Sequence, residues 1–71
     1  MDQIICFELR WDCILAIPYG FDYFSKNKIF LLKNETEKQI ELRSLSGQKI
    51  FVAKEQLQHN FNTVKMKLEK I

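Results

Sequence analysis

The side chains able to support covalent catalysis in this sequence are two cysteines, Cys6 and Cys13, and one histidine, His59. A thiol beside an imidazole can act as a nucleophile, but such a pair can be drawn in any chain that holds both residue types. His59 stands at the end of a short helical segment, where a surface residue or a C-terminal cap is the simpler interpretation. No paired-carboxylate pattern stands out, and two isolated glycines cannot form a phosphate-binding loop. We therefore predict that the protein is not an enzyme.

The same three side chains are the natural candidates for a zinc site. Structural zinc is usually held by ligand pairs that lie only about two to five residues apart. Cys6, Cys13 and His59 are scattered along the chain instead. We therefore expect no metal and no other cofactor.

The two cysteines lie in one apolar run that alternates like a strand. Seven residues of extended chain separate Cys6 from Cys13 by ~23 Å, far beyond the ~7 Å between Cα atoms that a disulfide spans, and the two side chains point to opposite faces. We expect reduced thiols, which suggest a reducing compartment. The first ten residues lack a basic leader, and no stretch approaches the ~20 apolar residues of a membrane span. The sequence therefore predicts a soluble, cytoplasmic protein that does not enter a membrane.

The stretch PYGFDYF, residues 18–24, gathers four aromatic side chains with the only proline and one of the two glycines. We interpret it as an irregular loop in which Phe24, and in part Phe21, closes the open end of the core. The tyrosines combine contact area with a hydroxyl group, which suits a protein interface. We therefore predict a contact surface for another protein, or for a second copy of the chain in a homodimer. Its residues are Tyr19, Phe21, Asp22 and Tyr23.

Nucleic-acid binding is the alternative, because small barrels can stack bases on aromatic rings and hold phosphates with lysines. The candidate phosphate contacts are Lys26, Lys28, Lys65 and Lys67, with Lys70 beyond them. Against this, Asp22 lies inside the aromatic cluster, and the net charge is only +2. The first 24 residues carry one basic and four acidic side chains, whereas the rest carry ten basic and five acidic ones, so a basic face on the later strands stays possible.

The elements that position these residues follow from the apolar pattern. Every odd position from Ile5 to Ile17 is apolar, which is typical of a half-buried strand with Trp11 in the core. Thirteen residues exceed a usual strand, so we expect a bend or bulge near Asp12. Pro18 should end this strand.

The rest of the chain alternates short strands with turns. We expect a polar turn at 25–28, a strand at 29–32, a charged turn at 34–38, strands at 39–45 and 48–53, one or two helical turns at 54–61 and a last strand around Val64, Met66 and Leu68. Ser46-Gly47 suits a two-residue hairpin turn, which would pair position 42 with 51 and 40 with 53. That register places Ile40, Leu42, Phe51 and Ala53 on the core side.

One domain over residues 1–71 follows from the length, and five short strands favour a small, partly open barrel. Residues 23–64 resemble the SH3-like barrel proteins common in phages and other bacterial mobile elements. The matching positions are Lys28-Ile29-Phe30, Ser46 and Gln48 around Gly47, and Leu57 with Phe61. Asn27 departs from the family pattern, which has glycine there. The resemblance implies an all-β, five-stranded SH3-like fold and no catalytic residue. It also implies an accessory role, such as binding and modulating, or inhibiting, a host or defence protein.

Overall fold

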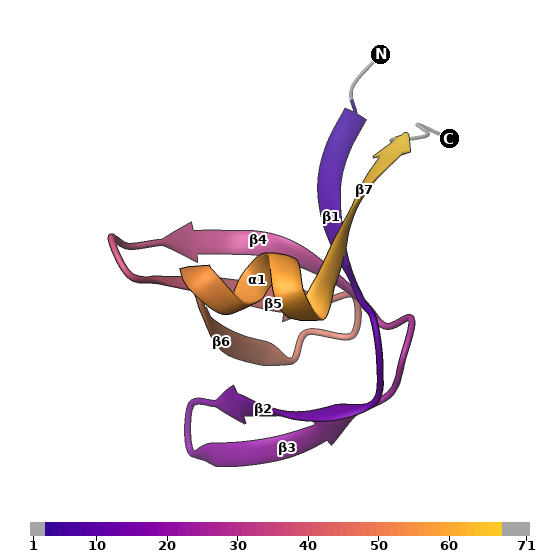
Figure 1. The fold of residues 1–71 in the computed structure, drawn as a ribbon. Helices are drawn as coiled ribbons and strands as arrows, with labels where there is room; N and C mark the ends of the chain where they lie inside the picture. The colour runs from indigo at the N-terminus through magenta and orange to yellow at the C-terminus, as the bar shows by residue number, and fades with distance from the viewer. Residues whose placement is uncertain (1–2, 68–71) are drawn as a thin grey trace.

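The computed structural model describes residues 3–67, and within them the chain forms one antiparallel sheet and one short helix (Figure 1). The elements in chain order are β1 (Gln3–Leu9), β2 (Cys13–Ile17), β3 (Gly20–Phe24), β4 (Ile29–Glu35), β5 (Gln39–Ser44), β6 (Lys49–Ala53), α1 (Lys54–Asn60) and β7 (Phe61–Lys67). The seven strands lie in the order β3-β2-β6-β5-β4-β1-β7. The all-β class is thus confirmed. The prediction of five strands is wrong, because PYGFDYF holds a strand of its own and the long first strand is divided in two.

The bend expected near Asp12 is present, since β1 ends at Leu9 and β2 begins at Cys13. Hydrogen bonds from the turn before β4 stabilise this corner between β1 and β2. The Asp12 carboxylate accepts a hydrogen bond from the Lys26 backbone N–H at 2.6 Å, and the Asn27 N–H donates to the Leu9 carbonyl at 2.8 Å. Asn27 adopts a left-handed φ of 74°, a conformation that asparagine tolerates better than most residues.

Trp11 lies at this corner and not in the core, so its predicted burial is wrong. The side chain is 42% exposed. Its indole N–H donates to the Asn60 side-chain oxygen at 3.3 Å, and its ring meets His59 edge to face at 5.5 Å. The break between β1 and β2 interrupts the alternation at this residue, so that Trp11 braces the corner against the end of α1.

The core is centred on Phe30, which is fully buried. Its ring packs edge to face against Phe24 at 5.7 Å and against Phe61 at 5.8 Å, a favoured geometry for aromatic rings. These contacts join β4 to β3 and β7, the two edge strands at opposite ends of the sheet order, so the curled sheet folds around one cluster. The other buried members are Leu9, Leu15, Ile40, Leu42, Ile50 and Val52. Phe24 therefore fills the core as predicted.

The hairpin of β5 and β6 has a different register from the one predicted. Leu42 pairs with Ile50 and Ile40 with Val52, and all four are buried. The loop has three residues, 45–47, closed by a hydrogen bond from the Ser44 N–H to the Gln48 carbonyl, with Gly47 at a φ of 96°. A shift of one residue turns every side chain of a strand to the other face. Phe51 and Ala53, predicted for the core, therefore lie on the outer face.

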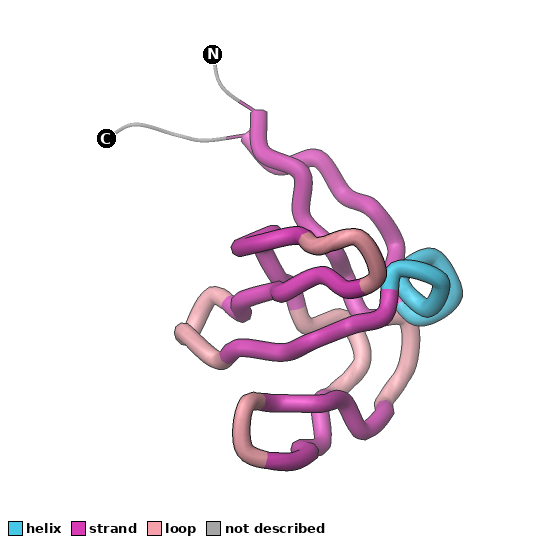
Figure 2. Tube along the Cα trace, turned by 90° about the vertical axis from the view of Figure 1, so that its left-hand side faces the viewer, coloured by secondary structure: helices cyan, strands magenta, loops and turns pink. Residues whose placement is uncertain are grey.

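The sheet is not closed into a barrel, and it forks beside β1. The pairing of β1 with β4 covers only Glu8 to Cys6, whereas β1 continues with β7 as far as Gln3. β4 turns away from this point and continues with β5. The pair β1–β7 therefore stands out as an arm at the top of the molecule, opposite the β2–β3 hairpin at the bottom (Figures 1 and 2). In the described part of the chain no helix is long and apolar enough to cross a membrane.

Candidate functional site

An exposed apolar surface covers the outer side of the β2–β3 hairpin. Ile14 pairs with Tyr23 and Ala16 with Phe21, and directly paired residues of antiparallel strands share a face. Ala16 also pairs with Phe51 of β6, which extends the row into the main sheet. We name these five residues the hairpin face: Ile14, Ala16, Phe21, Tyr23 and Phe51. The exposed fractions are 67% for Ile14, 75% for Phe21 and 58% for Tyr23, which is far more than a folded core position retains.

The hairpin is apolar on both sides, and only one of them is covered. The inner side carries Leu15 and Phe24, which are buried in the core, with Cys13 and Ile17 packed partly against it. β2 reads as a continuous apolar run, CILAI, a pattern typical of strands that are covered on both faces. Because the described residues leave the hairpin face open to water, this pattern indicates a surface that another molecule covers.

Pro18 and Tyr19 form the tip of the hairpin, between the paired residues Ile17 and Gly20. Proline suits the first position of a tight turn because its φ is fixed, and Gly20 accepts a φ of 143°. Tyr19 is consequently 98% exposed. The predicted irregular loop is therefore wrong, and Phe21 lies outside the core. Tyr19 and Tyr23 are exposed as expected, and the other two predicted contact residues, Phe21 and Asp22, also face water.

Tyr23 lies close to Asp12 in the corner between β1 and β2. The hydrogen bond from the Lys26 backbone N–H lowers the pKa of the Asp12 carboxyl, and the Tyr23 side chain lowers it further. The Asp12 carboxylate is in turn the main cause of the raised pKa of Tyr23. The Tyr23 hydroxyl therefore faces a carboxylate of its own chain. The ring itself is an exposed apolar surface.

Asp22 has a different place from the other predicted contact residues. It pairs with Leu15 and so points to the inner side of β3, at the edge of the sheet. Its carboxylate accepts a hydrogen bond from the Tyr23 backbone N–H at 2.8 Å. An inward-pointing charge on an edge strand, with a backbone donor already used, disfavours the addition of a further strand. The open side of the hairpin is therefore its face and not its edge.

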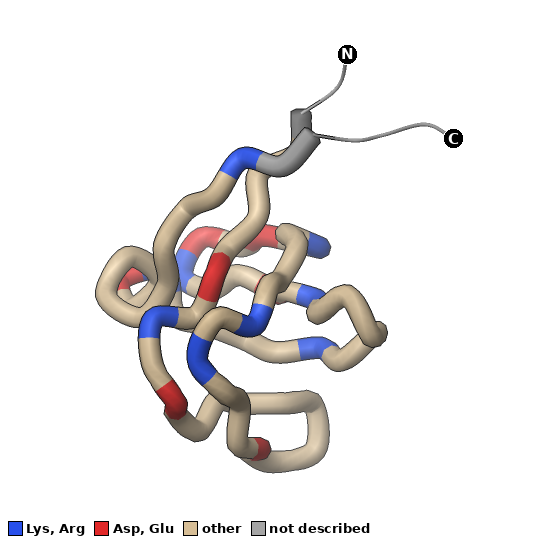
Figure 3. The backbone as a smooth tube through the Cα atoms, turned by 90° about the vertical axis from the view of Figure 1, so that its right-hand side faces the viewer, with Lys and Arg blue, Asp and Glu red and all other residues tan. Residues whose placement is uncertain are grey.

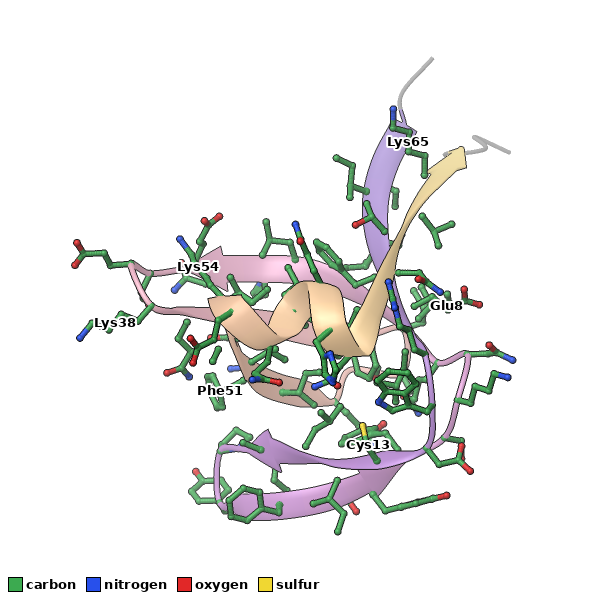
Figure 4. The ribbon with its side chains drawn as sticks, in the orientation of Figure 1. Glu8, Cys13, Lys38, Phe51, Lys54 and Lys65 are labelled. Carbon is green, nitrogen blue, oxygen red and sulfur yellow. The ribbon has the colours of Figure 1, made fainter. Side chains whose placement is uncertain are left out.

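The lysines of the alternative prediction do not gather on the hairpin face. Lys26 and Lys28 flank the corner turn, and the Lys28 ammonium lies 5.8 Å from the centre of the Phe24 ring. Lys65 is on the arm, at the opposite end of the molecule from Cys13 of β2 (Figure 4). The Lys67 side chain and Lys70 lie outside the described residues. The β2–β3 hairpin, lowest in Figure 3, contains Asp22 and no basic residue.

The candidate catalytic and metal-binding residues are also apart. Cys6 is buried in β1, Cys13 is half-buried in β2, and both are free thiols. Burial raises the pKa of each, and the charge of Asp12 raises that of Cys13 further, so the protonated thiol is favoured. The His59 ring packs against Trp11, and in the described part of the chain no hydrogen bond joins it to Cys6 or Cys13. Among the described residues no group of three metal-ligating side chains comes together.

Three residues of the hairpin face, Ile14, Ala16 and Phe51, were missed from the sequence. Ile14 falls on an even position of the strand predicted for residues 5–17. The alternation placed the even positions on the solvent-exposed face, so no role was assigned to Ile14. The usable signal was that Ile14 and Ala16 make the even positions of β2 as apolar as the odd ones. Phe51 was missed because the register of its hairpin was shifted by one residue. Comparison with protein-family models, with curated proteins and with solved structures found no match to this chain.

Proposed function

We propose that this protein is a non-enzymatic binding module that contacts another protein through the hairpin face. The proposal rests on one observation: the β2–β3 hairpin has apolar side chains on both sides, but the core covers only the inner side. Aromatic rings of this kind are typical anchors of protein interfaces, where they contribute large contact areas at a low entropic cost. Tyr23 supports this role, because its ring is 58% exposed on the hairpin face.

The charges around the hairpin face favour a protein partner over a nucleic acid. Asp12 lies beside Tyr23 of this face, Asp22 lies on the other side of the same strand, and residues 11–24 contain no lysine or arginine. A polyanion would therefore be repelled where its bases would have to stack. A partner segment that combines apolar side chains with lysine or arginine fits this surface better, because its charges complement the two carboxylates.

The resemblance to phage SH3-like proteins suggests a more specific role. In that role, binding through the hairpin face modulates or inhibits a target protein of a host or defence system. A cytoplasmic location agrees with the unlinked thiols Cys6 and Cys13. Both statements rest on the proposal that the hairpin face binds a protein.

The test is site-specific photo-crosslinking in cells of the source organism. A photoreactive phenylalanine analogue replaces Phe21 in one variant and Leu45 in a matched control, because Leu45 is 67% exposed but lies in the β5–β6 turn. We expect one protein to be crosslinked from position 21 and not from position 45. Equal crosslinking from both positions, or recovery of nucleic acid whose affinity falls steeply with salt, would refute the proposal.

A further inference from the structure

The fork between β1 and β4 opens a second apolar surface, far from the hairpin face. The last pair joining these strands is Cys6 with Leu31, and beyond it the strands diverge. Their side chains line a groove of about 510 Å³, which is made of Ile4, Ile5, Phe7, Leu31 and Leu32. Ile5 is 54% and Leu32 48% exposed, so this groove is apolar and open to water.

The rim of the groove is basic. Lys65 of β7 pairs directly with Ile5, and Lys33 follows Leu32 at a β-bulge. The acidic residue at the end of β4, Glu35, is bound to Lys54 at 2.7 Å, so its charge is compensated within the chain. Glu8 lies below the fork, where β1 and β4 are still paired. An occupant of this groove should accordingly be apolar, aromatic or aliphatic, and carry negative charge beside its apolar part.

The tip of the β2–β3 hairpin has this chemistry. Tyr19 and Phe21 are its most exposed rings, at 98% and 75%, and Asp22 follows Phe21 on the other side of the same strand, where it is also exposed. The tip is a narrow two-residue turn of the β2–β3 hairpin, which lies at the bottom of the molecule, whereas the β1–β7 arm, whose strand β1 lines the groove, lies at the top (Figures 1 and 2). Within one chain the two surfaces are therefore too far apart to meet.

We propose that the fork groove receives the hairpin tip of a second copy of this chain. The rings of Tyr19 and Phe21 enter the apolar groove, and Asp22 approaches the basic rim at Lys33 and Lys65. The contact joins two different surfaces, so each bound copy still offers one free tip and one free groove. Such head-to-tail contacts close into rings or continue as chains. Because the tip is part of the hairpin region, self-association competes with the binding of another protein there.

The experiment mixes two variants that each lack one half of the contact. The tip variant carries Tyr19→Ser with Phe21→Ser, and the fork variant carries Leu32→Glu. The control is Leu45→Ser, which removes an exposed apolar side chain outside both surfaces. Sedimentation velocity is measured for each protein from about 10 µM to about 1 mM, the range in which small interfaces associate measurably.

We expect the wild type and the Leu45→Ser control to grow beyond a dimer as the concentration rises, and each surface variant to remain a monomer alone. An equimolar mixture of the two variants should form a complex of one copy of each and stop there, because only one intact tip meets one intact groove. A wild type that stays monomeric throughout would overturn the proposal. So would variants that associate alone, or a mixture that does not associate.

If circular dichroism shows that the Leu32→Glu variant is unfolded, a second pair of variants tests the same contact. Lys33→Glu with Lys65→Glu reverses the charge of the rim at exposed positions, and should weaken self-association at least fivefold. Mixing this variant with Asp22→Lys should restore part of the loss. No change on reversing the rim charge would contradict the assignment of the groove. Crosslinking of a different protein from position 21 would still support the proposed function, so the two proposals can fail separately.

Discussion

The Tyr23 side chain lies beside the Asp12 carboxylate, so the edge strand of the hairpin meets the corner between β1 and β2, and each group shifts the pKa of the other. Asp12 also accepts a hydrogen bond from the Lys26 backbone N–H, so three segments of the chain meet at one carboxylate. This relationship leads to the first prediction.

Removing the Asp12 carboxylate should lower the pKa of Tyr23 toward its ordinary value, because this carboxylate is the main cause of the raised pKa. In a Tyr19→Phe background Tyr23 is the only tyrosine, so its ionisation can be followed by ultraviolet absorbance. The titration midpoint of Asp12→Ala in this background should lie below that of the parent. An unchanged midpoint would show that the two groups do not interact in solution.

The same pair sets the sign of two pH effects on stability. The pKa of Asp12 is lowered by folding, so its contribution is present at neutral pH and is lost as the pH falls below about 4, through the lowered pKa. The pKa of Tyr23 is raised, so its contribution is present below about pH 10 and is lost as the pH rises through the raised pKa. Both dependences should be reduced in Asp12→Ala, as measured by urea unfolding across the pH range.

The register of the β5–β6 hairpin predicts opposite outcomes for two neighbours. Ile50 is fully buried, so Ile50→Ala should cost about 2–5 kcal/mol of unfolding free energy. Phe51 lies on the hairpin face, so Phe51→Ser should cost clearly less and should weaken partner binding instead. Urea unfolding monitored by circular dichroism measures the first effect. A larger loss of stability for Phe51→Ser than for Ile50→Ala would restore the register expected from a two-residue turn.

Trp11 and Phe30 should likewise differ in their contribution to stability. Phe30→Ala removes the ring that contacts both Phe24 and Phe61, and should cost about 3–5 kcal/mol. Trp11→Ala removes one exposed aromatic pair with His59, which is worth about 1 kcal/mol. Thermal and urea unfolding provide the comparison. Equal losses in the two variants would place the indole in the core after all.

Asp22 should protect the open edge of β3. In Asp22→Ala the Tyr23 backbone N–H loses its acceptor and the edge loses its charge, so strands of different copies can pair. We expect this variant to form sheet aggregates that bind thioflavin, whereas Asp22→Asn, which keeps an acceptor oxygen, should form fewer. If Asp22→Ala stays as free of such aggregates as the wild type, the edge is protected by something else.

The parts of the fold that the sequence predicted are those set by local chemistry. The bend near Asp12 and the helix at Lys54–Asn60 each follow from a break in the apolar periodicity. The burial of Phe24 follows from its apolar side chain, which has no polar atom. The register of β5–β6 was not predictable in this way. A glycine after serine suits both a two-residue turn and a three-residue loop ending in a left-handed glycine, and the two differ by one residue in every pair.

The candidate site was predicted in its residues but not in its construction. Four aromatic residues around Pro18 were interpreted as a loop, because proline usually ends a strand. In the structure Pro18 forms the turn itself and the aromatic residues belong to β3. Which of these residues face water then depends on how β3 pairs with β2. The apolar pattern of a single segment does not reveal how two strands pair.

The central claim, that the hairpin face binds a protein, is tested most directly by the affinity of the crosslinked partner for one double variant. Ile14→Ser with Phe21→Ser changes two exposed side chains of the hairpin face and leaves the core intact. Isothermal titration calorimetry should show an affinity at least about tenfold lower than that of the wild type and of Leu45→Ser, because buried aromatic anchors carry much of the binding free energy of an interface. The melting temperature should stay close to that of the wild type. An unchanged affinity in a folded double variant would contradict the claim.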